Sequence, residues 1–136
     1  TIPDRKRAGQ IIEILWDKLY TTFGLRTLSP DSPDYKGTYS GGPYRRDEAY
    51  HQGTVWPWLT GQFIEAYLRF NDYSAASRKT ARLLLEPFKA HLDESCIGSI
   101  SEIFDGNDPM LPKGCFAQAW SVAEILRVYL AAMKED

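Results

Sequence analysis

Glu102 is the acidic residue whose neighbours in the sequence are most favourable for proton-transfer chemistry. It lies in the segment SISEIFDGNDP, beside Ile100, Ile103 and Phe104. An apolar environment raises the pKa of a carboxyl group and makes the group useful as an acid or base near neutral pH. The alternative is a surface carboxylate that caps a turn or pairs with an arginine. The acidic residues that follow, from Asp105 onward, are typical of turns.

A second group of chemically versatile residues lies in the segment YHQGTVWPWLTG. His51 has no second histidine at a spacing that would suit a metal, so no metal site is expected, and a structural histidine is the alternative. Trp56 and Trp58 could belong to the core or could form a flat platform for the apolar face of a sugar ring. Residues two apart on a helix point to different faces, so one of these tryptophans should face the loops.

Charged residues stand just before that segment. Arg45 and Arg46 could hold ligand hydroxyls, or could pair with Asp47 and Glu48. Aromatic rings with scattered carboxylates, amides and guanidinium groups suit the recognition of neutral polyols. The sequence contains no Gly-rich phosphate loop, CxxC pair or Ser-centred nucleophile motif. This pattern favours carbohydrate recognition without specifying it.

The length and composition indicate one compact domain. A chain of 136 residues can bury a core, and its net charge of -2 gives no reason to expect a nucleic-acid or membrane partner. Cys96 and Cys115 match no metal or disulfide framework, and we expect packed, reduced thiols in a cytoplasmic protein. No cofactor is expected. Because the chain begins at Thr1 rather than Met, we expect either a piece of a longer protein or a shortened protein.

Hydrophobic periodicity predicts four helices, at about residues 4–23, 54–71, 74–92 and 116–133. Gly24 is expected to cap the first helix, and Thr54 to begin the second with Pro57 in its first turn. Pro87 is expected to kink or shorten the third.

Two long segments without a predicted helix, residues 25–53 and 93–114, separate these helices. No sustained strand alternation is visible, although CIGSISEIF could form a short hairpin, so the predicted class is all-α. Long segments rich in aromatic and acidic residues inside a small domain are usually functional. The alternation of helices and long loops suits a partial α/α toroid, in which the loops at one end form the site.

Two long motifs carry a family resemblance. FGLRTLSPDSPDYKGTYSGGPYRRDEAYHQGTVWPWLTGQFIEAYLR and SISEIFDGNDPMLPKGCFAQAWSVAEILRVYL resemble the C-terminal part of glycogen debranching enzymes, in particular the bacterial and archaeal amylo-alpha-1,6-glucosidase type. The resemblance covers roughly Phe23 to Leu130. It implies that residues 1–136 are a single segment, the last third of a glucoamylase-like, six-hairpin α/α barrel. It also implies inverting hydrolysis of α-1,6-glucosidic branch points in glycogen or limit dextrin.

The resemblance also implies roles for particular residues. Glu102 matches the general base that activates the attacking water. The glucose subsite would be formed by Arg46, Asp47, His51, Trp56 and Trp58, with Gln118 brought to it by the first turn of the last helix. The family's general acid is an aspartate from an upstream region, and this sequence offers no counterpart.

Other interpretations stay open. The chain could be a non-catalytic carbohydrate-binding or regulatory module that retains the aromatic pocket, or an unrelated helical domain with a protein-binding surface. An incomplete ring of helices would expose apolar faces, so we also expect homo-oligomers.

Overall fold

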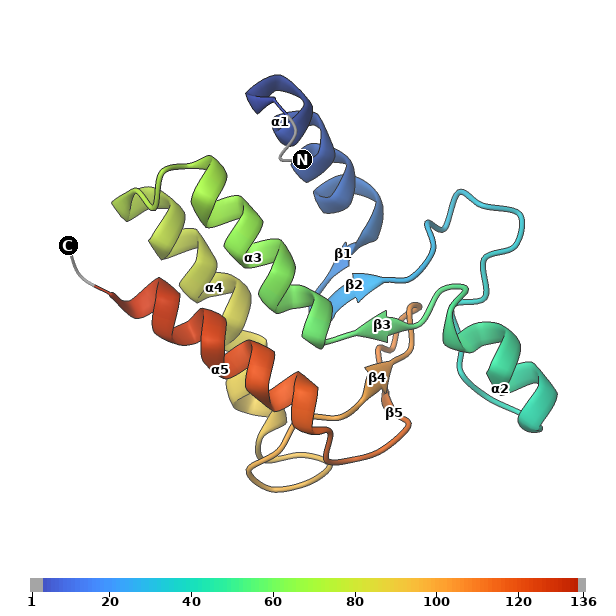
Figure 1. The fold of residues 1–136 in the computed structure, drawn as a ribbon. Coiled ribbons are helices and arrows are strands. Elements are labelled where there is room, and N and C mark those ends of the chain that lie inside the picture. The colour runs from blue at the N-terminus through green and yellow to red at the C-terminus, as the bar shows by residue number, and fades with distance from the viewer. Residues whose placement is uncertain (1–3, 135–136) are drawn as a thin grey trace.

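Four long helices stand side by side at one end of a small sheet (Figure 1). The computed structural model describes residues 4–134. Its long helices are α1 (Arg5–Ile14, continued by the π-helical turn η1, Leu15–Leu19), α3 (Trp58–Phe70), α4 (Ala75–His91) and α5 (Ala119–Met133). About half of the described residues are helical, which confirms the mainly helical class.

A five-stranded antiparallel sheet, which the sequence patterns did not indicate, adds to this helical fold. Its strands in spatial order are β1 (Tyr20–Thr21), β2 (Gly24–Arg26), β3 (Val55–Trp56), β4 (Ile103–Phe104) and β5 (Pro112–Lys113). Strands of two or three residues are too short to show alternation, and they exist only because distant segments pair. The segment CIGSISEIF forms no hairpin of its own. Its last two residues, β4, pair with β3 and β5 instead.

The sheet also moves helix boundaries away from the predicted ones. Thr54 is not an N-cap, because β3 follows it and α3 begins only at Trp58, with Pro57 before it. Gly24 does not cap a helix but starts β2, with a φ of +134°. The first helix accordingly ends at Leu19, and the predicted extension to residue 23 is wrong.

The helix α4 follows its prediction closely at the N-terminus. The Ser74 side chain accepts a hydrogen bond from the backbone N–H of Ser77, as an N-cap serine should. Pro87 does not end the helix early, because α4 continues to His91.

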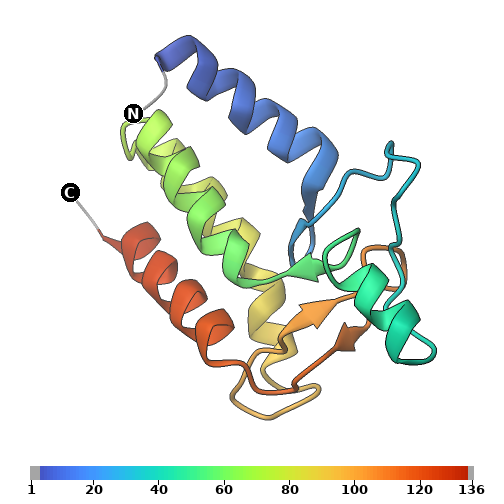
Figure 2. The same ribbon diagram turned by 45° about the vertical axis from the view of Figure 1, so that its right-hand side comes forward.

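A further helix, α2 (Pro43–Tyr50), lies inside the first predicted loop. It stands apart from the four long helices, on the far side of the sheet (Figures 1 and 2). Of the residues of α2, all of which the structure describes, Ala49 alone is buried. Without an apolar stripe, α2 leaves no periodic signal in the sequence.

The hydrophobic core joins α3, α4 and α5. Phe63, Ile64 and Leu68 of α3 pack with Leu85 of α4 and Val128 of α5, all nearly inaccessible to solvent. Burial of such side chains contributes about 1.5–3 kcal/mol each before entropy is counted. Because α3 and α5 both run away from the sheet (Figure 2), their first turns lie together beside it.

In the described part of the chain, no helix is long and apolar enough to cross a membrane.

Candidate functional site

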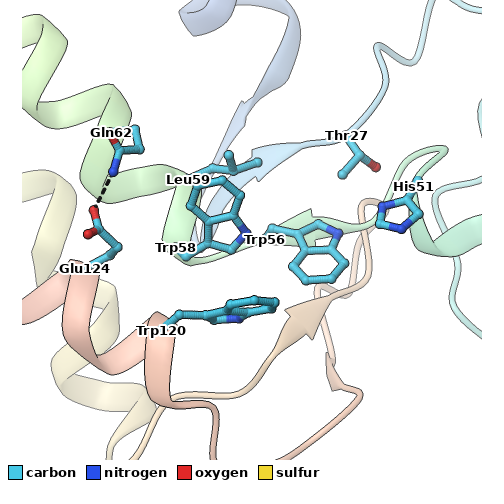
Figure 3. A pocket seen from close by; sticks show the side chains of 8 residues that line it. All are labelled: Thr27, His51, Trp56, Trp58, Leu59, Gln62, Trp120 and Glu124. Atoms are coloured by element: carbon cyan, nitrogen blue, oxygen red, sulfur yellow. Dashed lines mark hydrogen bonds between the residues drawn. The ribbon is translucent and has the colours of Figure 1, made fainter.

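A cavity of about 500 Å³ opens where the first turns of α3 and α5 meet β3 (Figure 3). Its lining combines three indole rings with a few polar groups: Thr27, His51, Trp56, Trp58, Leu59, Gln62, Trp120 and Glu124. An apolar wall with a small number of polar groups is the usual make-up of a small-molecule site.

Trp56 forms the inner part of this wall. As a residue of β3 it pairs with Leu25 of β2, and only 5% of its surface is exposed. Its indole N–H donates to the backbone oxygen of Tyr50 over 3.0 Å. The His51 ring lies nearly parallel to it, with 5.6 Å between ring centroids. The expectation that one of the two tryptophans faces the loops assumed that both lie on one continuous helix. Trp56 instead belongs to a strand and Trp58 to α3, and both line the cavity.

The outer part of the wall comes from two helices. Trp58 begins α3, Trp120 is the second residue of α5, and their ring centroids are 6.4 Å apart. Trp120 is 51% exposed, so it offers a free aromatic surface. One turn further along the same helices, the Gln62 amide donates to the Glu124 carboxylate over 2.9 Å, which places polar groups at that end of the cavity (Figure 3).

Glu102 lies next to this cavity, separated from its lining by the side chain of Tyr50. Its backbone stands directly before β4, and its carboxyl group is half-buried. The Tyr50 hydroxyl donates to Oε1, and the backbone N–H of Cys115 donates to Oε2 over 2.8 Å. The flanking Ile103 is buried in the core, but the carboxyl group itself meets two polar donors. The expected apolar surrounding therefore applies to the backbone, not to the carboxylate.

Tyr50 connects Glu102 with the aromatic wall. Its ring centroid is 4.9 Å from that of His51 and 4.7 Å from that of Trp56, in edge-on contacts. Partial burial, together with the negative charge of Glu102, raises the pKa of the Tyr50 hydroxyl well above its ordinary value. The hydroxyl therefore keeps its proton and acts as a hydrogen-bond donor.

The two long segments are ordered against one another. Asp105, expected to be a turn residue, is buried, and its Oδ1 accepts from the backbone N–H of Tyr39 over 2.7 Å. Its Oδ2 lies 3.6 Å from the ammonium group of Lys113. The backbone N–H of Gly106 donates to the oxygen of Gly37 over 2.7 Å. These contacts bring the segment that carries Tyr50 to the segment that carries Glu102.

The structure brings some of the predicted site residues together and leaves others apart. His51, Trp56 and Trp58 line one cavity, and Glu102 adjoins it through Tyr50. Arg46 and Asp47 lie on the exposed surface of α2, outside the lining.

Three more expectations can be compared with the geometry, for Gln118, Glu48 and Cys115. Gln118 precedes α5 and is held by its backbone N–H, which donates to the oxygen of Ile100, but it too lies outside the lining. Glu48 pairs with Lys36 at 3.0 Å rather than with a neighbouring arginine. Cys115 is exposed, so the expectation of a packed thiol is wrong for this residue.

Sequence reasoning missed Tyr50, Gln62, Trp120 and Glu124. Tyr50 stands next to His51 and Trp120 follows Gln118 closely, so their positions offered a weak signal. Gln62 and Glu124 gave none, since they meet only through the packing of α3 on α5. Within residues 4–134, no group of three or more His, Cys, Asp or Glu side chains is arranged to hold a metal ion.

Known proteins match most of the chain. The family model described as amylo-alpha-1,6-glucosidase matches residues 1–127. The glycogen debranching enzyme of Saccharomyces cerevisiae is 28% identical over 143 residues, a match that covers 91% of this chain and 9% of the yeast protein. The chain therefore spans a small part of the length of that relative. Because the family match extends over nearly the whole sequence, this chain belongs to the amylo-alpha-1,6-glucosidase family.

Proposed function

We propose that this chain supplies the general base and part of the glucose pocket of an inverting glycoside hydrolase that cleaves α-1,6 branch points in glycogen or limit dextrin. The observation that carries the proposal is the placement of the Glu102 carboxylate one tyrosine away from His51 and Trp56. Family membership and the yeast debranching enzyme, named for its action on glycogen, support the substrate class.

Inverting hydrolysis requires a general base and a general acid. In an inverting reaction a carboxylate removes a proton from water as the water attacks the anomeric carbon, while a second carboxyl group protonates the leaving oxygen. The two carboxyl groups lie about 6.5–9.5 Å apart, which leaves room for the water. Glu102 has both oxygens fixed by donors, which suits a base that must face one water molecule. We assign the second carboxyl group to another part of the protein.

The aromatic wall would hold the sugar. A pyranose ring has apolar faces that pack on indole rings, and its hydroxyls need oriented polar partners. Trp120 offers an exposed ring face, and Gln62 and Glu124 stand one helical turn away as hydroxyl partners. If the family's α/α toroid is completed by further helices, we expect α3 and α5 to face its central funnel and this wall to line that funnel.

The proposal is tested by the Glu102→Gln variant of the complete gene product, with glucose released from a branched limit dextrin as the readout. Loss of the general base should lower kcat by about 10²–10⁴-fold. Glu86→Gln, an exposed carboxylate that pairs with Lys89, is the matched control and should leave the rate unchanged. Near-normal turnover by Glu102→Gln would reject the assignment.

A second candidate function is carbohydrate binding without catalysis. It is favoured by the fact that this chain alone forms the wall of three tryptophans, whereas no second carboxylate is assigned as the acid. Calorimetric titration with maltooligosaccharides, combined with a glucose-release assay, separates the two. Binding with no release from any glucan by the complete gene product would favour the binding module.

A further inference from the structure

Tyr50 is the one described residue that contacts both Glu102 and the aromatic wall through hydrogen bonds. Its hydroxyl donates to Oε1 of Glu102. Its backbone oxygen accepts from the Trp56 indole N–H over 3.0 Å and from the Thr54 hydroxyl over 2.6 Å. One residue thus fixes a carboxylate at its side-chain end and an indole ring at its backbone end.

The ring between these two ends is also held. It touches His51 and Trp56 edge-on and approaches Tyr39, with 5.8 Å between the two tyrosine centroids. Aromatic pairs favour edge-to-face arrangements, so these contacts stabilise the observed orientation of the ring. Because Tyr50 closes α2, the last turn of that helix sets where the hydroxyl lies.

The other end of Glu102 is fixed independently. Its Oε2 accepts from the backbone N–H of Cys115, and its own backbone N–H donates to the Cys115 oxygen, both over 2.8 Å. Cys115 follows β5 and comes after Glu102 in the sequence, whereas α2 comes before it. The carboxyl group is therefore held between two segments that are 65 residues apart in sequence, Tyr50 and Cys115.

We propose that Tyr50 is a positioning residue that fixes the Glu102 carboxylate relative to the sugar-binding wall. The inference rests on the proposed function, in which Glu102 is the base. Tyr50 itself takes no proton: it aims one carboxylate oxygen and stabilises the ionised form by donating a hydrogen bond.

The hydroxyl stays a donor over the pH range in which carboxyl groups titrate, because its pKa is raised. Among the described residues, the rings of Tyr39 and His51 neighbour Tyr50, and Cys115 contacts Glu102 through its backbone N–H. Removal of the Tyr50 hydroxyl leaves these groups in place, so a change in the acidic limb of the pH profile would report on Glu102.

The first test compares Tyr50→Phe with Tyr35→Phe in the complete gene product. Tyr35 is the matched control, since its hydroxyl also donates across the two long segments, to Asn107 over 3.0 Å, without touching Glu102. For Tyr50→Phe we expect kcat to fall by about 10–100-fold, the effect of one lost hydrogen bond to a charged acceptor, with KM changed by less than about threefold. The acidic limb should move to higher pH, because the ionised base has lost a donor. Tyr35→Phe should do neither.

A second measurement does not depend on activity. The carboxyl carbon of Glu102, followed by NMR during a pH titration, should show a higher midpoint in Tyr50→Phe than in the unaltered protein or in Tyr35→Phe. Should Tyr50→Phe fail to fold, replacement of Tyr50 by 3-fluorotyrosine retains the ring and strengthens the donor. The midpoint should then move to lower pH.

The outcomes separate the two proposals. If Glu102→Gln is inactive but Tyr50→Phe retains its kcat and its acidic limb, the positioning role is wrong and the general base stands. If Glu102→Gln retains activity, the proposed function fails, while the NMR midpoint still decides whether Tyr50 controls the carboxylate. An unchanged midpoint in Tyr50→Phe, or in the 3-fluorotyrosine protein, overturns the inference.

Discussion

Gly114 lies directly against the carboxyl group of Glu102. A Cβ added at this glycine would overlap Oε2 of Glu102 and approach its Cβ to 3.2 Å, and the φ of Gly114 is +68°. Glycine adopts such a φ without steric cost, whereas other residues do not. The position of the proposed base therefore depends on the absence of a side chain twelve residues further along the chain.

Gly114→Ala should destabilise the protein and displace the Glu102 carboxylate. We expect a loss of about 1–3 kcal/mol in the free energy of unfolding, from the strained backbone together with the overlap. Urea denaturation measures it. Gly98→Ala is the control, because Gly98 has a φ of +78° with nothing within 4 Å of its would-be Cβ. Equal losses in the two variants would show that the contact with Glu102 adds nothing.

Trp120→Ala should weaken sugar binding while it leaves the fold largely intact. Its ring is half exposed and packs near Trp56 and Trp58. We expect the Kd for maltooligosaccharides, measured by calorimetry, to rise by about tenfold, which corresponds to about 1.4 kcal/mol. Trp56→Ala, at the buried ring, should instead lower the free energy of unfolding by about 3–5 kcal/mol. Unchanged affinity in Trp120→Ala would remove this ring from the proposed subsite.

His91→Ala should be strongly destabilising. The His91 side chain is fully buried at the end of α4, its Nε2 accepts from the backbone N–H of Ser101 over 3.2 Å, and its ring packs on Phe104. Removal would leave a cavity and a buried N–H without its acceptor, at a cost of about 2–4 kcal/mol in the free energy of unfolding. His51→Ala, at an exposed ring, should cost less than about 1 kcal/mol. A small effect at His91 would contradict the structural role that we assign to it.

Tyr20 should make the protein less stable at alkaline pH. Burial raises the pKa of its hydroxyl to about 12, from the ordinary value of about 10. The folded protein thus holds this proton where the unfolded chain releases it, so the contribution to stability is full below pH 10 and is lost as the pH rises toward 12. The total loss is about 3 kcal/mol, since one pKa unit corresponds to about 1.4 kcal/mol.

The matching experiment is urea denaturation at pH 9 and pH 11 for the unaltered protein and for Tyr20→Phe. The decrease between the two pH values should be smaller in Tyr20→Phe, which has no hydroxyl to ionise. The same decrease in both proteins would place the alkaline sensitivity in other groups.

The exposed apolar face of α5 should drive self-association of the isolated chain. Leu126 and Leu130 are 55% and 57% exposed and lie one helical turn apart, so they form part of one surface. Sedimentation velocity should show dimers or larger species for the unaltered chain. The double variant Leu126→Gln/Leu130→Gln should form a smaller fraction of these species. Lys79→Gln on α4, also exposed, serves as the control. A clean monomer at high concentration would contradict the expectation.

The helices could be predicted because their signals are local. The apolar stripe that includes Phe63 and the N-cap at Ser74 both act within a few residues, and α3 and α4 lie where these features indicate. The family resemblance, which likewise rests on sequence alone, agrees with the family to which the chain belongs. His51, Trp56 and Trp58, which the family resemblance implied for one subsite, line the same cavity, although the sequence pattern alone left a core role open for both tryptophans.

Only the tertiary structure decided how these parts meet. The pairing of Val55 with Phe104 joins segments 49 residues apart, and strands of two residues have no pattern of their own. The contact of Tyr50 with Glu102 and that of Gln62 with Glu124 depend on this pairing and on the packing of α3 against α5. A sequence determines which residues favour a helix through local interactions, whereas a site made from distant segments is fixed by hydrogen bonds and packing that exist only once the chain has folded.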